Sequence, residues 1–241
     1  MNAAEQYQSE GYVVMEGLLS RGHISRLRER MDEIASGKTP GHPSGDIELE
    51  PGGGAIRKIN RCAENDAVFR AHAEHPGILN IVESLIGPDI KLFASQCFMK
   101  PPGGVAKPWH QDSAYFCIEP MALVTCWTAL DDVTIENGGM WVIPGSHKKG
   151  LVEHSPWNLG ERVDKQAFPQ EESGKCAIEM PAGGCSFHHS MLLHRSGPNR
   201  TDRPRRGLAV HYMSALSQWT DASNPKPDYP LLRGREYTGC V

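Results

Sequence analysis

Two segments within the first ninety residues carry apolar side chains at helical spacing. In the first, Ser20 is placed as an N-cap and Gly37 as the residue that ends the helix. The apolar positions between them are three, four and three residues apart and share one face: Ile24, Leu27, Met31 and Ile34. In the second, Pro76 suits a first turn and Gly87 follows the end, which predicts a helix over residues 77–86. Each helix is expected to bury one face.

From residue 90 onward the pattern changes to short β-prone runs. Turns rich in Gly, Pro and Asn separate these runs, as in chains that build many short strands. The expected strands lie near residues 90–98, 121–130, 140–143, 176–180, 185–189 and 206–213, with a shorter one at 11–14. Helices followed by many short strands predict a mainly β protein, a sandwich or barrel with helices packed outside it.

The remaining segments are expected to be loops and flanks of one domain. Residues 38–54 are rich in Gly and Pro without a period, which predicts a loop able to move or to close over a ligand. Residues 151–175 are polar and poorly patterned, which indicates an insertion between strands. No repeat or composition break divides the chain. We therefore expect a helical flank over about 1–89, a β core over about 90–215 and a tail over 216–241.

Composition disfavours several classes of function. Hydrophobic residues make up 39% of the 241 residues and charged residues 22%, which supplies a core and shows no bias toward disorder. A net charge of −4 disfavours nucleic acid or an anionic membrane surface as the main partner. No apolar run approaches the ~18 residues of a membrane span, and no signal peptide is visible. Seven cysteines without a C-x-x-C pair fit a soluble protein of the reducing cytoplasm.

The candidate chemistry lies in two short segments far apart in the sequence. His110 and Asp112 are two residues apart, which in an extended segment points both side chains to one face. His194 follows a β-prone run and offers a second imidazole that a closed or two-layered β fold could bring to the pair. Two His and one carboxylate are the ligands of non-haem Fe(II) oxygenases and leave three positions for co-substrate and O2. Alone, such an H-x-D pair also arises by chance, and an isolated His is more often structural.

An arginine cluster after His194 strengthens this interpretation. Arg205 lies eleven residues after His194, and a guanidinium that enters a cavity from a strand can bind a carboxylate through two hydrogen bonds. A 2-oxo diacid bound to the metal by its other end requires such a group. The same stretch also holds Arg195, Arg200, Arg203 and Arg206. The alternative interpretation is a solvated basic loop.

Several motifs together resemble the phytanoyl-CoA dioxygenase family of Fe(II)- and 2-oxoglutarate-dependent oxygenases. They are His-Gln-Asp at 110–112, Pro-Gly-Ser-His at 144–147, His-Arg-Ser-Gly-Pro-Asn at 194–199, and Arg205. Their order and spacing agree at separate points, and the resemblance covers nearly the whole chain, to about Tyr212. It implies a double-stranded β-helix, or jelly-roll, core with helices on one side.

The resemblance also implies the roles of individual residues. Iron would be held by His110, Asp112 and His194. The distal carboxylate of 2-oxoglutarate would be anchored by Arg205, with Ser196 nearby. Positions where family members often contact this co-substrate match Lys58, Gln96 and Trp127.

Arg206 is a rival to Arg205, because a change of register by one residue would turn it inward instead. Gly207, Ala209 and His211 share the parity of Arg205. Small residues beside Arg205 would leave space for a ligand, which favours Arg205.

Other histidines and aromatic residues have structural alternatives. His188 and His189 are adjacent on a strand, so at most one faces inward, and we expect a structural or pocket-lining role. His147 is expected to stabilise a turn. Trp141 and Phe187 are expected in the core. Three aromatic residues lie near the metal segment or in the insertion: Tyr115, Phe116 and Trp157. Two interpretations stay open for them, lining of a substrate pocket and simple packing.

The activity implied by the resemblance is oxidative decarboxylation of 2-oxoglutarate with O2, giving succinate and CO2, coupled to oxidation of an unactivated C–H bond. Asp112 favours hydroxylation, because family halogenases lack this carboxylate; desaturation, epoxidation and ring formation use the same ligands. Outside the arginine cluster described above, no basic run fits the phosphates of CoA, so a small polar metabolite or natural-product intermediate is favoured over an acyl-CoA. Two alternatives stay open: a non-catalytic metal- or metabolite-binding β-barrel, and a cupin-type isomerase or hydrolase, against which Arg205 argues.

Overall fold

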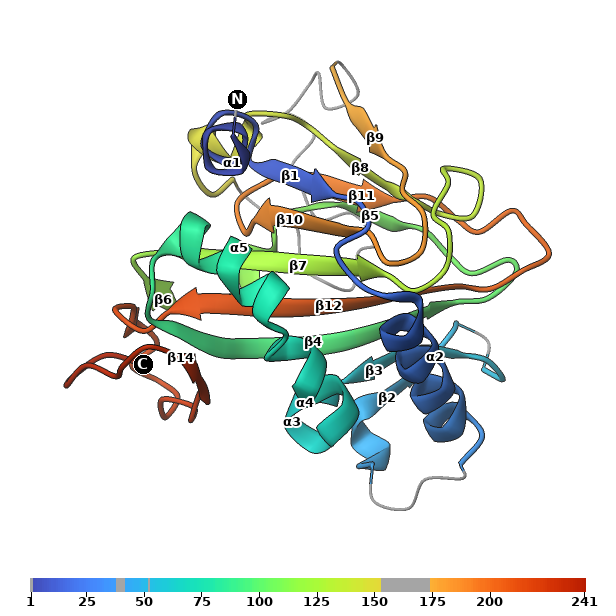
Figure 1. Ribbon diagram of the computed structural model, residues 1–241, viewed down its shortest axis with the longest axis horizontal. Helices are drawn as coiled ribbons and strands as arrows, with labels where there is room; N and C mark the ends of the chain where they lie inside the picture. Colours follow the sequence, from blue (N-terminus) through green and yellow to red (C-terminus); the bar gives the residue numbers. More distant parts are fainter. Residues whose placement is uncertain (1, 38–41, 52, 153–173) are drawn as a thin grey trace.

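The computed structural model describes residues 2–37, 42–51, 53–152 and 174–241. Its main β-sheet forms around a long strand that begins at residue 90, where the helical spacing of apolar residues stops. That strand, β4, spans Ile90–Lys100 and lies between β12 and β3 (Figure 1). The strand order is β1 (Tyr12–Met15), β10 (Cys185–His189), β7 (Leu123–Ala129), β12 (Arg205–Ser214), β4, β3 (Ile56–Asn60) and β2 (Ile47–Leu49). All pairings in it are antiparallel.

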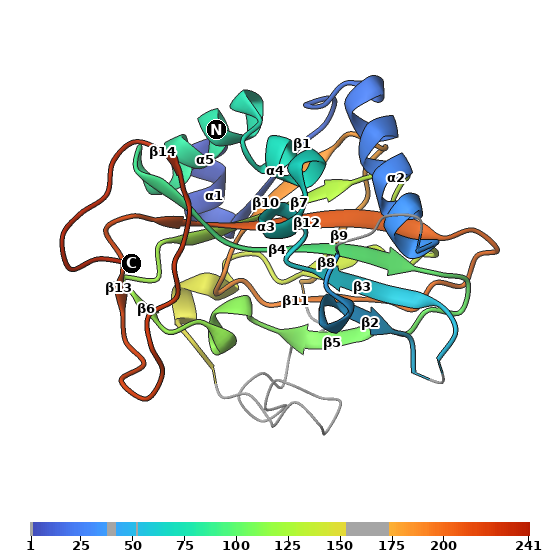
Figure 2. The ribbon, with the colours of Figure 1, turned by 90° about the horizontal axis from the view of Figure 1, so that it is seen from below.

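A smaller sheet covers the inner face of the main sheet. It consists of β5 (Lys107–His110), β11 (His194–Ser196), β8 (Met140–Val142) and β9 (Cys176–Ile178), in that order. Figure 2 shows helices above the main sheet and the smaller sheet below it. Two facing antiparallel sheets leave an interior lined by alternate residues of each strand, which is where a ligand pocket can form.

Helices cover the outer face of the main sheet. They are α1 (Ala3–Glu10), α2 (Arg21–Ala35), α3 (Cys62–Asn65), α4 (Ala67–Ala73) and α5 (Pro76–Ile86). The side chain of Ser20 caps α2 by accepting from the His23 amide, and the four predicted apolar positions of α2 are buried. α5 begins at Pro76 as predicted. These faces pack on the outward residues of the sheet, including Val124, Leu208 and Val210. The predicted mainly β chain with helices outside is therefore confirmed.

Several elements have no signal in the sequence pattern, among them three helices and an edge strand. α1 is mostly polar and buries only Tyr7, so it has no apolar period; a capping box of Asn2 and Glu5 holds its first turn. α3 and α4 are too short to show a period. The predicted loop over 38–54 is wrong for residues 47–49, because β2 pairs there with β3 at the edge of the sheet. Residues 38–41 and 52 lie outside the described residues.

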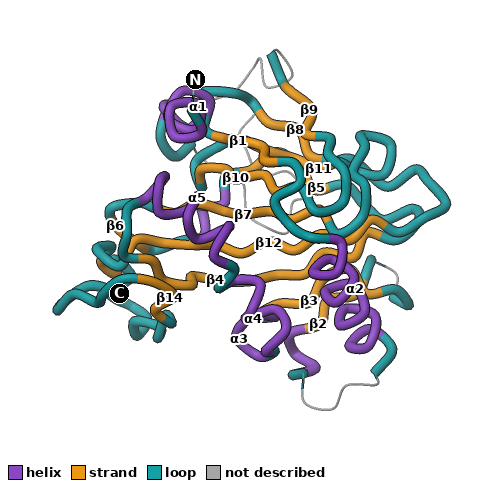
Figure 3. The backbone as a smooth tube through the Cα atoms, viewed as in Figure 1, coloured by secondary structure: helices purple, strands orange, loops and turns teal. Residues whose placement is uncertain are grey.

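Part of the expected C-terminal tail joins the fold. This segment runs mostly as loop beside β4 (Figure 3), and its strand β14 (Leu231–Arg233) pairs with β4. β13 (Gln218–Trp219) pairs with β6 (Ile118–Glu119). Tyr229 and Val241 are buried against Leu123 and Met213. No helix in the described part of the chain combines the length and apolar character that crossing a bilayer requires.

Candidate metal centre and its pocket

The pairing of two short strands brings the two predicted histidines together. β11 runs antiparallel to β5, and His194 lies directly opposite His110 in the register. Their ring centroids are 4.0 Å apart. Oδ1 of Asp112 lies 3.6 Å from Nε2 of His110 and 3.7 Å from Nε2 of His194. In the described residues this is the one group of His, Cys, Asp or Glu that brings three potential metal ligands together, all within 4.8 Å of one another.

The chain stays extended between His110 and Asp112. β5 ends at His110, and the 3-10 turn η2 (Asp112–Tyr115) begins at Asp112. Gln111 between them has φ −117° and ψ 135°, which is extended backbone. The side chains of His110 and Asp112 therefore lie on one side of the segment, as the alternation predicted.

The hydrogen bonds of both histidines leave their Nε2 atoms available for a metal. Nδ1 of His110 lies 2.8 Å from the carbonyl of Pro108, and Nδ1 of His194 lies 2.9 Å from the carbonyl of Leu192. A carbonyl only accepts, so each Nδ1 carries the proton and each Nε2 presents a lone pair. Nε2 of His110 is buried without a hydrogen-bond partner among the described atoms.

Burial keeps these rings neutral at physiological pH. It lowers the pKa of His110 well below its usual value, with Lys107 and His194 adding to the effect. It lowers the pKa of His194 to about 4. Neutral imidazoles and a carboxylate are the protonation states that bind a divalent cation, so the residues present fit an iron ion.

A second set of contacts holds the carboxylate. Thr125 Oγ1 donates to Oδ2 of Asp112 at 3.1 Å and lies 2.8 Å from Nδ1 of His211. Nε2 of His188 lies 3.8 Å from the same oxygen. Burial alone would raise the pKa of Asp112, but His194, His188 and His211 outweigh it and hold the pKa well below its usual range. One carboxylate oxygen is thus fixed from behind while the other faces the two metal-binding rings.

The predicted division between the adjacent histidines is seen directly. His188 lines the pocket and is buried. His189 faces the other way, with its ring centroid 5.9 Å from that of Tyr7 and 5.3 Å from that of His147. His147 sits in the turn η3 (Ser146–Lys149), with Nε2 3.2 Å from the carbonyl of Gln8, away from the triad.

The triad lies in a pocket of about 820 Å³, counted to its open mouth, between the two sheets. Arg205 lies in it, only 4% exposed. Its guanidinium donates to the carbonyl of Gly138 at 3.0 Å and stacks 5.1 Å from the ring centre of Trp127. Burial lowers the pKa of Arg205 to about 10, so it stays charged. Its Nε has no hydrogen-bond partner among the described atoms.

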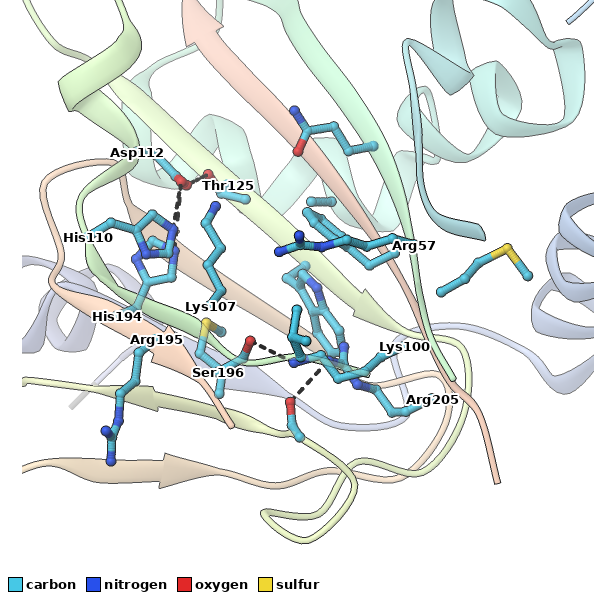
Figure 4. A pocket seen from close by; sticks show the side chains of 18 of the residues that line it. Arg57, Lys100, Lys107, His110, Asp112, Thr125, His194, Arg195, Ser196 and Arg205 are labelled. Atoms are coloured by element: carbon cyan, nitrogen blue, oxygen red, sulfur yellow. Dashed lines mark hydrogen bonds and ion pairs between the residues drawn. The ribbon is translucent and has the colours of Figure 1, made fainter. Parts of the chain in front are cut away.

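Lys100 stands beside Arg205, as Figure 4 shows. Lys100 and Arg205 are direct partners in the register of β4 and β12. Nζ of Lys100 donates to Ser196 Oγ at 2.9 Å and to the carbonyl of Gly197 at 2.6 Å. Burial, followed by the charge of Arg205, lowers the pKa of Lys100 to about 7. Two cations and a hydroxyl therefore meet at one end of the pocket.

Arg206 points to the opposite face of β12. It forms ion pairs with Asp131 at 3.0 Å and with Asp32 of α2 at 2.8 Å. The structure therefore places Arg205, and not Arg206, in the pocket. The space beside Arg205 is only partly open, because the Trp127 indole lies over Gly207.

The positions matched by family resemblance divide into two groups. Gln96 and Trp127 line the pocket. Lys58 is not among the residues that line the pocket; its Nζ lies 3.5 Å from Glu48 and 5.9 Å from the ring centre of Phe98. The charged and polar pocket-lining residues that the sequence did not indicate include Arg57, Lys100, Lys107 and Thr125. Strand pairing with Arg205 would have indicated Lys100, but that register is not legible in the sequence.

The predicted aromatic residues have fewer described contacts with the site than the histidines have. Phe116 packs with its ring centroid 4.4 Å from that of Phe93 and 5.6 Å from that of His211. Tyr115 is described only by its place in η2, and Trp157 lies outside the described residues. Phe187 is fully buried in the core as expected, and Trp141 is partly buried beside Trp109 and Leu193.

Comparisons with known proteins agree with this geometry. The family model described as phytanoyl-CoA dioxygenase matches residues 7–207. A probable phytanoyl-CoA dioxygenase of Caenorhabditis elegans is 30% identical, over 87% of this chain and 75% of its own. L-proline trans-4-hydroxylase of Streptomyces griseoviridis is 29% identical, over 100% of this chain and 95% of its own.

The fold comparison points the same way. The epimerase SnoN, solved in complex with Fe3+, alpha ketoglutarate and nogalamycin RO, has a TM-score of 0.78 and 25% identity to this chain. The similarity covers 96% of this chain and 97% of SnoN. The family resemblance and the jelly-roll fold predicted from sequence are confirmed.

Proposed function

The chain belongs to the phytanoyl-CoA dioxygenase family, and from this premise we propose how its pocket works as the active site of an Fe(II)- and 2-oxoglutarate-dependent dioxygenase. We assign iron to His110, Asp112 and His194, and the distal carboxylate of 2-oxoglutarate to Arg205. We assign hydroxylation of a C–H bond in a small polar metabolite or natural-product intermediate as the reaction, with succinate and CO2 as co-products.

One observation carries the proposal. A buried triad and a buried guanidinium share one cavity, and among the described atoms Nε2 of His110 in the first and Nε of Arg205 in the second have no hydrogen-bond partner. Leaving buried polar atoms without partners is costly, and a metal at one place and a carboxylate at the other would satisfy both. A 2-oxo diacid has the two ends that such a pair of sites requires.

The residues of the chain divide the work of binding and orientation. Arg205 binds the distal carboxylate with its fork of N–H donors, and Trp127 supports the guanidinium from one side. Lys100 and Ser196 add a charge and a hydroxyl at the same end. Thr125 keeps Asp112 turned toward the two histidines. When bound, iron with 2-oxoglutarate supplies the activation of O2 and the oxidising power that breaks the C–H bond.

Two features favour hydroxylation of a small molecule. Asp112 occupies the carboxylate position, so the ligand set is that of a hydroxylase and not of a halogenase. L-proline trans-4-hydroxylase, a relative named for a small-molecule substrate, is similar over 100% of this chain.

The direct test is succinate formation from 2-oxoglutarate by the Fe(II)-loaded protein under O2. We expect slow turnover without added substrate, no turnover above background for His110→Ala and Asp112→Ala, and a much raised 2-oxoglutarate requirement for Arg205→Ala. Matched controls are Asp202→Ala and Arg203→Ala, whose side chains are 93% and 90% exposed. Wild-type turnover by Asp112→Ala would remove that residue from the metal site.

A further inference from the structure

We propose that Arg57 forms a second anion site in the pocket, which binds a carboxylate of the substrate. The substrate class is then an organic acid. This inference rests on the proposed function, because it takes Arg205 to be occupied by the co-substrate.

Arg57 enters the cavity from the same sheet as Lys100 and Arg205, on the strand nearer the edge of that sheet. It belongs to β3, next to β4 in the main sheet, and lines the same pocket as the triad. Figure 4 shows its guanidinium turned into the cavity toward the side of the triad, apart from Lys100 and Arg205. A group held by Arg57 would therefore share the pocket with the co-substrate without competing for Arg205.

Arg57 is attracted to the charge of the nearby Glu48 but forms no close contact with an anion of the described residues. In the described part of the chain its guanidinium has neither a hydrogen bond nor an ion pair. The nearby Glu48 is engaged by Asn60 Nδ2 at 2.8 Å and by Lys58 at 3.5 Å. Glu50 lines the mouth and accepts from the Val105 amide at 3.4 Å.

Positive charge exceeds negative charge among the residues that line the pocket. The cations are Arg57, Lys100, Lys107, Arg195 and Arg205, and the anions are Glu50 and Asp112. Iron and the co-substrate dianion cancel each other, so the loaded pocket keeps this excess. A guanidinium in such a pocket favours a carboxylate, which it binds through two hydrogen bonds.

The remaining lining indicates the body of such a substrate. Phe98, Met99, Val105 and Met140 line the pocket with apolar side chains. Val105, at 38% exposed, places an apolar surface at the mouth. An acid whose hydrocarbon part spans from Arg57 toward the metal would satisfy both the charge and the walls.

The test compares acids with their primary amides, which keep the shape and remove the charge. Straight-chain acids of two to eight carbons and L-amino acids, each paired with its amide, are titrated into Fe(II)- and 2-oxoglutarate-loaded protein without O2. Binding is measured by calorimetry and thermal unfolding, and stimulation of succinate formation is then measured under O2.

We expect ligands only among the acids. Arg57→Met should weaken the best acid by about tenfold to a hundredfold, the loss typical of a charge-assisted contact. Arg57→Lys should recover part of this, and Arg203→Met should bind as wild type. At pH 6, below the pKa of Lys100 of about 7, the 2-oxoglutarate requirement and unstimulated succinate formation of Arg57→Met should match wild type, because Arg57 has no hydrogen bond or ion pair with the described residues.

Each contrary result has a distinct meaning. Amides that bind as well as acids, or no binding by any acid to a protein that makes succinate, would overturn the carboxylate site. A raised 2-oxoglutarate requirement in Arg57→Met would assign Arg57 to the co-substrate and also overturn it. Absence of succinate from wild type would instead refute the proposed function.

Discussion

The two faces of strand β7 carry the same pair of side chains, a threonine against a histidine, with opposite consequences. On the inner face, Thr125 Oγ1 lies 2.8 Å from His211 and donates to Asp112. On the outer face, Thr128 Oγ1 lies 3.2 Å from Nε2 of His72, which is fully buried under the helices.

The outer pair is complete in itself. Nδ1 of His72 lies 3.0 Å from Nε2 of His23, so both ring nitrogens of His72 have partners. The hydrogen bonds of the inner face are not complete, because Nε2 of His110 has no hydrogen-bond partner among the described atoms. Buried histidines alone therefore do not mark a ligand site in this fold. The feature that indicates a ligand site is a buried nitrogen that faces a cavity and has no hydrogen-bond partner.

Replacing one threonine on each face should give the largest contrast. Thr125→Val removes the donor to Asp112, and loss of such a supporting contact typically weakens metal binding about 10- to 100-fold. Thr128→Val should leave metal affinity unchanged and lower the free energy of unfolding by about 1–3 kcal/mol, because Nε2 of His72 loses its partner. Iron titration and chemical denaturation measure the two effects.

The comparison fails if both variants lose metal to the same degree, because the two faces would then be coupled through the strand. It also fails if Thr125→Val binds iron as wild type does. Valine keeps the shape of threonine, so neither result could be explained by a cavity.

A second contrast compares the space around two glycines, one on the inner face of the sheet and one in helix α2. A side chain at Gly207 would overlap the indole of Trp127, which stacks on Arg205, whereas one at Gly22 in α2 would meet no atom within 4 Å. Gly207→Ala should displace Trp127 and raise the 2-oxoglutarate requirement about tenfold, the size of a desolvated cation–π contact. Gly22→Ala should not change it. An unchanged requirement in Gly207→Ala would show that Trp127 does not support the arginine.

The outer face was largely predictable from the sequence, whereas the inner face was predictable only in part. α2 and α5 bury apolar residues at regular spacing, and spacing is a local property. The triad and Arg205 were found because two motifs and a fixed offset carry the family resemblance. Lys100 and Arg57 belong to no motif, and only the pairing of β4 with β12 and β3 brings them to the pocket.

One strand was missed for a physical reason. β2 was hidden in a stretch rich in Gly and Pro, since an edge strand of three residues needs no apolar alternation. The convergence of His110 and Asp112 was predictable, because Gln111 keeps an extended backbone up to the start of η2 although β5 ends at His110.

The smallest expected effect is a pH dependence of the affinity for 2-oxoglutarate. It distinguishes a buried base on the inner face, Lys100, from one on the outer face, His72. Burial lowers the pKa of His72 to about 3, so this base stays neutral throughout the neutral range. It lowers the pKa of Lys100 only to about 7, so Lys100 is partly neutral in the free protein near pH 7. A co-substrate carboxylate beside Lys100 favours its charged form and raises its pKa in the complex. Binding then takes up a proton between pH 7 and that higher pKa.

The affinity for 2-oxoglutarate should therefore fall as pH rises above 7, by less than the limit of about tenfold per pH unit for one proton. Calorimetry in buffers of different ionisation enthalpy measures the proton uptake directly. Lys100→Met should bind more weakly and show neither the uptake nor the slope. Lys91→Met is the matched control, because Lys91 is a buried lysine of the same strand whose Nζ lies 2.9 Å from Glu236, outside the pocket. If Lys100→Met kept the slope, the titrating group would lie elsewhere, and the cation beside Arg205 would be charged throughout this pH range.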